Sequence, residues 1–411
     1  MPRHRLFVPF VPLLFGVILA LVPGSARAAG VCEPDGIQPS GAVYRICMPE
    51  TWNGSLVLFA HGYVAFNEPV AIPEDQLVLA DGTSVPGIIN ALGFAFATTS
   101  YATNGLAVKE GIADLVELVG IFARGHGVAR RVFLVGPSEG GLITALAIER
   151  HPETFDGGVA ACGPIGNFKR QTDYLGDFRV IFDHFFPNVI PGSPIDVPPD
   201  VIDGFYDLYV DRILEAVRAD PGAAAQLLSV TRAPVDPQAP ATVEDTILGL
   251  SWYDVFATND ATEKLGGGPY GNRMRYYLGS DRDLLLNLTV PRFDADPEAL
   301  AAIESGYQTS GRLSRSLVTL HTTGDPIIPY WHEPMYRLKV LAAGAGDRHM
   351  NIRVDRYGHC TFKAGEVLLA FAVMLFRAAG QPLRGVEAVL QDPVDLQQFR
   401  ELSLRYGVVP R

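Results

Sequence analysis

The chain has 411 residues, of which 48% are hydrophobic and 19% charged, a composition typical of a globular protein with one large domain or two ordinary ones. Disorder, collagen and coiled coil are therefore excluded as its main architecture. Lys and Arg number 33, Asp and Glu 45, and the net charge is −12 with no long basic run. An acidic chain of this kind is not expected to bind nucleic acid or an anionic membrane.

The first thirty residues are typical of a secretory signal peptide. Arg3 and Arg5 precede an apolar run over 6–22, and the small-residue triplet Ala-Arg-Ala ends at Ala28. This order predicts export, with cleavage near Ala28. The alternative is a membrane anchor, but the run is short for a bilayer span and contains two prolines. We therefore expect a secreted protein, extracellular or periplasmic, without a stable membrane anchor.

Four cysteines follow the predicted cleavage site: Cys32, Cys47, Cys162 and Cys360. An even number in an exported chain allows two disulfides. Pairing of Cys32 with Cys47 is favoured because the turn-forming residues between them can bring two neighbouring extended segments together. Cys162 and Cys360 then remain as a second disulfide or as two buried free thiols. Without a CxxC pair or a histidine cluster, no zinc site is predicted, and no metal or cofactor is expected.

From residue 43 onward, short β-branched runs alternate with longer amphipathic stretches. This alternation predicts an α/β protein with a mostly parallel central sheet and helices on both faces. The expected helices cover 107–124, 142–149 and 366–378, where apolar residues recur at helical spacing. The expected strands are Val43–Met48, Ser55–Ala60, Phe94–Thr99, Arg131–Val135, Gly158–Ala161, Ser316–Leu320 and Asn351–Val354.

The middle of the chain, 165–312, interrupts this rhythm. It is rich in proline and aromatic residues, contains helical pieces such as 203–218, and has no convincing apolar strand. The strand pattern resumes at Ser316, so the simplest interpretation is an insertion between two strands of one sheet. We therefore expect a signal peptide (1–28), a core (29–164 and 313–411) and a cap or lid insertion (165–312).

The sharpest local motif is Gly136-Pro137-Ser138-Glu139-Gly140-Gly141, a G-x-S-x-G match. It lies between the apolar run 132–135 and the helical stretch 142–149, and so at a strand-to-helix turn. That context is the one a nucleophile elbow requires. The glycines leave room for a strained serine backbone, and the following helix directs its N-terminal N–H groups at the reacting oxygen. The alternative is an ordinary helix N-cap serine.

A serine nucleophile needs a base and an acid that orients the base. His359 follows the expected strand 351–354, and Asp325 follows the expected strand 316–320. Both therefore belong at the carboxyl edge of the sheet, in the chain order Ser, Asp, His. Asp325 could instead serve only as a turn former before Pro326, His359 could be a structural loop residue, and Asp355 is a rival acid.

On these motifs the chain resembles the α/β-hydrolase superfamily, in the manner of a secreted serine esterase or lipase, with some resemblance to the prolyl-oligopeptidase-type catalytic domain. His61-Gly62-Tyr63, after the strand 55–60, adds to the likeness. The resemblance implies an oxyanion hole made by the backbone N–H groups of Tyr63 and Glu139. It also places the cap insertion between strands 6 and 7 of the family's sheet, and implies a structural role for His61.

The insertion carries aromatic residues at spacings of three and four, among them Phe178, Phe182 and Phe186. Such a stripe is typical of an ordinary core, and is alternatively the wall of an apolar substrate pocket. With no conspicuous cationic cluster there, we expect a neutral ester, small or polymeric, as substrate.

A disulfide between Cys162 and Cys360 would have a further role, which is to hold the loop that carries His359 against the sheet.

The sequence thus predicts a carboxylic-ester hydrolase that uses Ser138, Asp325 and His359. Two alternatives stay open. One is a prolyl-oligopeptidase-like peptidase, which needs a group that recognises a peptide terminus. The other is a noncatalytic secreted binding protein that has kept the fold. The sequence does not specify an oligomeric state.

Overall fold

The computed structural model describes residues 31–79 and 81–408, so the predicted signal peptide lies outside the described residues. The centre of the protein is a nine-stranded sheet with the order β1-β3-β5-β4-β6-β7-β8-β9, in which β2 also pairs with β3. The strands are β1 (Val31–Cys32), β2 (Gly36–Ile37), β3 (Val43–Met48), β4 (Ser55–Phe59), β5 (Ala95–Thr99), β6 (Arg131–Pro137), β7 (Gly157–Ala161), β8 (Ser316–Gly324) and β9 (His349–Tyr357).

Strand direction places the functional loops at one edge of this sheet. The pairs β5–β4, β4–β6, β6–β7, β7–β8 and β8–β9 are all parallel, whereas β3 runs antiparallel to β5. The carboxyl ends of six neighbouring strands therefore lie together, and this is the edge where open α/β sheets bind ligands. All seven predicted strands form, with ends that differ by a few residues at most, except that β8 and β9 extend further than predicted.

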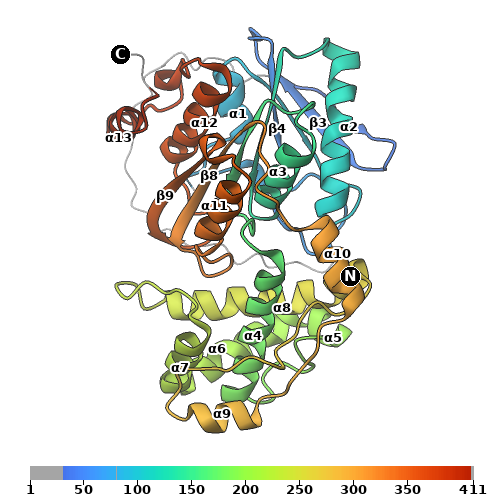
Figure 1. Cartoon of the computed structure of the whole chain (residues 1–411), viewed down its shortest axis with the longest axis vertical. Helices are drawn as coiled ribbons and strands as arrows, with labels where there is room; N and C mark the ends of the chain where they lie inside the picture. The colour runs from blue at the N-terminus through green and yellow to red at the C-terminus, as the bar shows by residue number, and fades with distance from the viewer. Residues whose placement is uncertain (1–30, 80, 409–411) are drawn as a thin grey trace, which may run out of the picture.

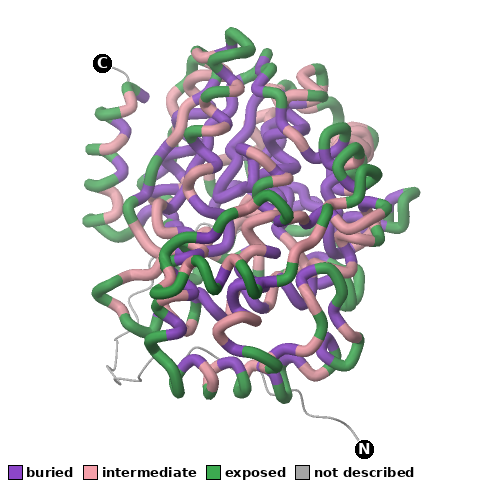
Figure 2. The backbone as a smooth tube through the Cα atoms, turned by 60° about the horizontal axis from the view of Figure 1, so that its bottom comes forward, coloured by how far each residue is buried: buried purple, intermediate pink, exposed green. Residues whose placement is uncertain are grey.

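Helices cover both faces of the sheet, as Figure 1 shows. Alternate residues of a strand belong to two separate hydrophobic cores, one on each face of the sheet. Leu58 of β4 packs into the core on the first face, and Val57 and Phe59 pack into the core on the second, as the two-residue period of a strand requires. Figure 2 shows the buried residues concentrated in the interior of the molecule. The first face packs against α2 (Val108–His126), α3 (Glu139–Arg150) and α11 (His332–Ala342), the second against α1 (Val85–Ala91), α12 (Ala364–Ala379) and α13 (Pro393–Arg405).

Between β7 and β8 the chain leaves the sheet, and within the described residues it forms helices and one isolated β-bridge, between Ser193 and Asp196. We call residues 163–315 the cap segment. It gathers at one end of the sheet (Figure 1) and has a core of its own, to which Ile327 and Ile328 of the following loop also contribute. The helices are α4 (Phe168–Phe185), α5 (Pro199–Asp203), the π-helical turn Phe205–Tyr209, α6 (Val210–Ala219), α7 (Pro221–Thr231), α8 (Thr242–Leu265), α9 (Asp283–Thr289) and α10 (Pro297–Gly306).

Two disulfides are present, and both follow the predicted pairing. Cys32 and Cys47 face each other across the antiparallel pair β1–β3, while Cys162, just after β7, joins Cys360, which follows β9. Disulfides fit an oxidising compartment outside the cytosol. None of the helices in the described part of the chain is both long and apolar enough to cross a membrane.

Candidate active site

The strand-to-helix turn at Ser138 has a strained backbone. Ser138 stands between β6 and α3 with φ 56° and ψ −124°, a conformation that costs a non-glycine residue about 1–3 kcal/mol. A Cβ on Gly136 would lie 2.2 Å from the Gly140 carbonyl oxygen, and one on Gly140 would lie 2.0 Å from the Ala60 carbonyl oxygen. The glycines of the motif are therefore required by close backbone contacts, as the elbow prediction assumes.

The side chains of Ser138, His359 and Asp325 form one hydrogen-bonded chain. His359 Nε2 lies 2.8 Å from Ser138 Oγ, and His359 Nδ1 lies 2.7 Å from Asp325 Oδ2. Because a buried carboxylate only accepts, Nδ1–H donates to Asp325 and leaves Nε2 to accept the serine proton. Asp325 directly follows β8, and Gly358, at φ 107°, turns the chain after β9 so that His359 faces it.

Asp325 is fully buried and held by several donors. Its Oδ1 accepts the N–H groups of Ile327 and Ile328, each at 2.9 Å. Burial alone would raise the pKa of Asp325, but the adjacent His359 and His321 outweigh burial and lower it. The acid therefore stays ionised, as an orienting carboxylate must. The rival acid, Asp355, is exposed and pairs with Arg353 at 2.6 Å.

A second histidine, His321, lies close to Asp325. His321 is fully buried, with Nε2 2.8 Å from the Ile328 carbonyl and 3.6 Å from Asp325 Oδ2, and Nδ1 3.1 Å from Glu333 Oε1. Burial lowers its pKa, yet the carboxylates of Asp325 and Glu333 more than compensate and raise it to about 10. His321 is therefore a cation that favours the charged form of Asp325.

The loop after β4 presents the backbone of Tyr63 to the site. The Gly62 N–H donates to Gln76 Oε1 at 2.6 Å, and Gln76 Nε2 donates to the Tyr63 carbonyl at 3.3 Å. These bonds fix the loop and leave the Tyr63 N–H without an acceptor among residues 31–79 and 81–408. His61 is buried and stacks on Tyr101 at 3.9 Å, with Nδ1 on the Gly62 carbonyl, which fits the structural role expected of it.

Glu139 begins α3, so its N–H is among those that have no acceptor within the helix. Its carboxyl group points into the fold, where Oε1 accepts the Ala107 N–H at 2.9 Å. Burial raises the pKa of this carboxyl to about 8, and the side chain is therefore mostly protonated at neutral pH. The side chain of Glu139 is therefore engaged within the fold.

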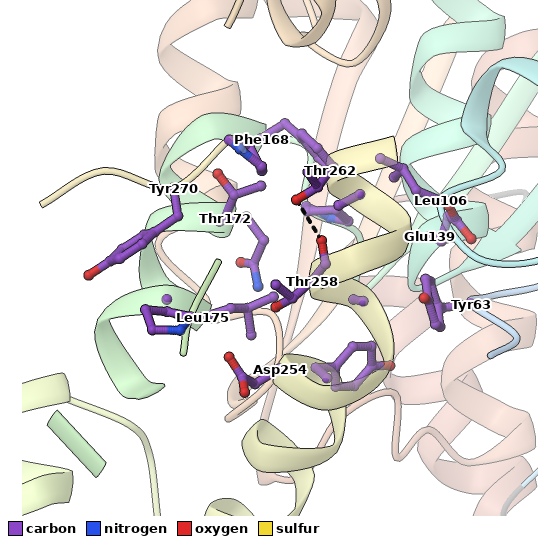
Figure 3. Close-up of a pocket in the computed structure, with 18 of the residues that line it drawn as sticks. Tyr63, Leu106, Glu139, Phe168, Thr172, Leu175, Asp254, Thr258, Thr262 and Tyr270 are labelled. Atoms are coloured by element: carbon purple, nitrogen blue, oxygen red, sulfur yellow. Dashed lines mark hydrogen bonds between the residues drawn. The ribbon is translucent and has the colours of Figure 1, made fainter. Parts of the chain in front are cut away.

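Two cavities meet at Ser138, and Tyr63 and Tyr253 line both of them. The first, here named the cap-side cavity, has a volume of about 120 Å³ and runs between α4 and α8; Figure 3 shows Phe168 and Thr172 on one side of it, and Thr258 and Thr262 on the other. The second, the sheet-side cavity, has a volume of about 280 Å³ and extends along the sheet face that packs against α12.

The predicted pocket phenylalanines lie elsewhere. Phe178, Phe182 and Phe186 are not among the residues that line either cavity. They pack against one another in sequence order, with ring centroids 6.1 and 5.3 Å apart, inside the core of the cap segment. The expectation of a substrate wall is therefore wrong for these three, and the ordinary-core alternative holds. Sequence reasoning also missed Tyr253, Gln76 and His321, none of which belongs to a recognisable local motif.

The cysteine and histidine side chains beside Ser138 do not form a metal site. Cys162, His359 and Cys360 are the one group of potential ligands that comes close enough together among the described residues, and both sulfurs belong to the disulfide. The Cys360 sulfur lies 3.5 Å from His359 Nε2. The disulfide therefore packs directly against the imidazole that faces Ser138.

The strand order, the elbow after β6 and the polar loops after β8 and β9 together define an α/β-hydrolase fold. Chemically, a serine hydroxyl bonded to a histidine that is itself held by a buried carboxylate can be activated as a nucleophile. Tyr63 and Glu139, whose N–H groups the sequence analysis expects to form an oxyanion hole, both line the cap-side cavity at Ser138.

No family model matches the sequence, and no curated protein does. Solved structures are similar in fold. An Aspergillus oryzae esterase aligns over 84% of this chain and 78% of its own, at 13% identity and a TM-score of 0.44. A puromycin hydrolase aligns over 84% of this chain and 38% of its own, at 14% identity and a TM-score of 0.42. Pyrococcus horikoshii acylaminoacyl peptidase aligns over 77% of this chain and 35% of its own, at 11% identity and a TM-score of 0.38. This chain therefore spans about a third of the length of that protein.

Proposed function

We propose that this protein is a secreted serine hydrolase that cleaves carboxylic esters through a covalent acyl-enzyme on Ser138. The observation that supports this best is the unbroken chain from Ser138 Oγ through His359 to Asp325, with distances of 2.8 and 2.7 Å. A structural serine gains nothing from this arrangement or from the strained turn that carries it.

In the proposed reaction, Ser138 Oγ attacks the acyl carbon while His359 Nε2 takes its proton. Asp325 keeps the imidazole in the required tautomer and stabilises the imidazolium. The backbone N–H groups of Tyr63 and Glu139 hold the negative oxygen of the tetrahedral intermediate. His359 then gives the proton to the leaving oxygen, the alcohol departs, and water repeats the sequence to release the acid.

Ester rather than peptide cleavage is favoured by the chemistry of the cavities. No Asp, Glu, Lys or Arg lines the sheet-side cavity, as far as the described residues go. The two carboxylic acids on the cap-side cavity are already engaged: Asp254 with Arg179, and Glu139 with a backbone N–H. Neither cavity therefore offers a free charge for a peptide terminus. Secretion is supported by the two disulfides together with the predicted signal peptide.

The test is active-site labelling of the folded protein with a fluorophosphonate, read by intact mass. One adduct is expected on wild type and none on Ser138→Ala. The control is Ser305→Ala, which alters an exposed serine on α10 that only bonds its own helix backbone and should keep the adduct. A panel of neutral esters and proline-linked peptides then ranks substrates. Absence of an adduct on wild type would leave the noncatalytic alternative, and faster peptide cleavage would favour the peptidase.

A further inference from the structure

His359 lines only one of the two cavities at Ser138, and this difference decides how an ester would lie in them. His359 lines the sheet-side cavity but not the cap-side cavity, whereas Glu139, the first residue of α3, lines only the cap-side cavity. Ser138 stands where the two meet. The sheet-side cavity therefore lies on the side of Ser138 that carries His359, and the cap-side cavity lies on the side where α3 begins.

Proton transfer fixes the orientation of the substrate. In acylation the bond between the acyl carbon and the alcohol oxygen breaks while a bond from Ser138 Oγ to that carbon forms. The proton that His359 Nε2 took from Ser138 passes to the departing oxygen, which must therefore come within hydrogen-bonding distance of Nε2. Whatever is attached to that oxygen extends to the side of Ser138 on which His359 lies.

From this we infer that the sheet-side cavity binds the alcohol part of the substrate and the cap-side cavity its acyl part, and that the substrate is an ester of a bulky apolar alcohol. This inference rests on the proposed function and specifies its substrate class. The sheet-side cavity is the larger of the two, at about 280 against 120 Å³. The alcohol part of the substrate is therefore the larger of its two apolar groups, and the acyl part is the smaller.

The lining of the sheet-side cavity selects an apolar occupant. Its walls are mainly aliphatic and aromatic, and its one amide side chain, Gln76, already bonds the loop at Gly62 and Tyr63. A charged or sugar-like alcohol would lose its water there without gaining partners. The apolar wall residues come mainly from strands, α1, α12 and the loop before α12, and include Phe59, Val135, Val159, Leu320, Phe362 and Val367.

The cap-side cavity is also apolar, although threonines and a glutamine lie on it. Thr262 Oγ1 donates to the Thr258 carbonyl at 2.9 Å, as Figure 3 shows, and Thr172 Oγ1 donates to the Lys169 carbonyl at 2.7 Å. Gln171 bonds the Ile327 carbonyl at 2.8 Å. These polar atoms are satisfied within the protein, and the space between them suits a short apolar acyl chain.

The experiment uses a matched set of four substrates, the ethyl and 2-naphthylmethyl esters of acetic and hexanoic acid. Val367→Phe adds a ring to the wall of the sheet-side cavity, and Ala257→Phe, on α8, adds one to the cap-side cavity. Val85→Phe is a second sheet-side variant at another point on the wall, for use if the first fails to fold.

Wild type is expected to prefer the naphthylmethyl over the ethyl esters by about tenfold or more in kcat/KM, because apolar groups in a fitting pocket are worth roughly 10–200-fold. Val367→Phe should abolish this preference, measured as the ratio of kcat/KM for the naphthylmethyl and ethyl esters within that variant. Ala257→Phe should keep the alcohol preference and lose the preference for hexanoate. Free 2-naphthylmethanol should inhibit wild type and Ala257→Phe, and should inhibit Val367→Phe about tenfold more weakly.

The opposite pattern, in which the sheet-side variants change acyl preference, would overturn the assignment. Unchanged preferences in both sheet-side variants, or a wild type that shows no preference for the bulky alcohol, would also overturn it. These failures are distinguishable from failure of the proposed function, because Ser138 would still be labelled by the fluorophosphonate and ester hydrolysis would persist.

Discussion

The disulfide between Cys162 and Cys360 provides a sharp test of how the base is held. Both residues have a left-handed backbone, with φ 45° and 54°, and the sulfur of Cys360 lies 3.5 Å from His359 Nε2. A left-handed L-residue costs about 1–2 kcal/mol. When the disulfide is removed, both residues are free to relax, and the loop that carries His359 loses its connection to β7.

The perturbation is the double variant Cys162→Ala/Cys360→Ala. The disulfide joins residues 198 apart in sequence, and in the chain-entropy account closing so long a loop is worth about 5 kcal/mol. The matched control is Cys32→Ala/Cys47→Ala, whose separation is 15 and whose loss costs about 3 kcal/mol by the same account. The control disulfide lies at the β1 edge of the sheet, away from Ser138.

Both double variants are expected to melt at lower temperature, the first by more. Only the first should lose activity at a temperature where each is folded. A misplacement of His359 by about 1 Å costs on the order of 100-fold, so we expect kcat on p-nitrophenyl acetate to fall at least tenfold, and fluorophosphonate labelling to slow in parallel. Lower thermal stability with unchanged kcat and labelling rate would refute the view that this disulfide positions the base.

Three further predictions concern single residues around the site. Gly140→Ala should fail to fold or lose at least about 3 kcal/mol of stability, because its Cβ would meet the Ala60 carbonyl oxygen at 2.0 Å. Gly125→Ala, in open space on α2, should instead gain about 0.5–1 kcal/mol of stability. Thermal melts that rank the two variants alike would contradict the clash. His321 has a pKa raised to about 10, so its charge stabilises the fold fully below pH of about 6.5 and the contribution is lost as pH rises through 10. Urea unfolding should therefore show an advantage of wild type over His321→Gln that shrinks from about pH 6 to 10, whereas a constant gap would mean an uncharged His321. The pKa of Glu139 is raised from 4.5 to about 8, so its contribution is present below pH 4.5 and is lost as pH rises through 8. Glu139→Gln should thus be the more stable protein at about pH 9 and should approach wild type near pH 5, and the reverse order would exclude a protonated Glu139.

Much of the site could be predicted because it is encoded locally. The glycine spacing around Ser138 is a property of six consecutive residues, and the backbone contacts of Gly136 and Gly140 show why the spacing is needed. Asp325 and His359 were predicted from their positions just after two strands. Parallel strands bring such positions to one edge of the sheet, whatever the sequence distance between them.

The substrate pocket could not be predicted in this way. The aromatic stripe on α4 correctly indicates a buried face, but helical periodicity does not say what buries it. Phe178 and Phe182 of α4, and Phe186 just after it, belong to the core of the cap segment. Other positions of α4, among them Phe168 and Thr172, line the cap-side cavity. Which face is which depends on how α4 packs against other helices.

Contacts between distant segments were equally hidden. Gln76 fixes the loop at Gly62 from a 3-10 turn, and no motif surrounds it. Tyr253 reaches both cavities from α8 of the cap segment. The charge of His321 depends on Glu333, which α11 brings to 3.1 Å. Each of these roles arises only when the chain has folded.

The walls of the two cavities differ in how freely they can change over evolution. Several positions in the sheet-side wall, such as Val159 and Leu320, are strand residues of the central core, and substitutions there put the whole fold at risk. Helix α8, which lines the cap-side cavity, belongs to a segment with its own core. Under the proposed assignment, descendants of this protein could diversify the acids they accept by altering one insertion, while their choice of alcohol would change slowly.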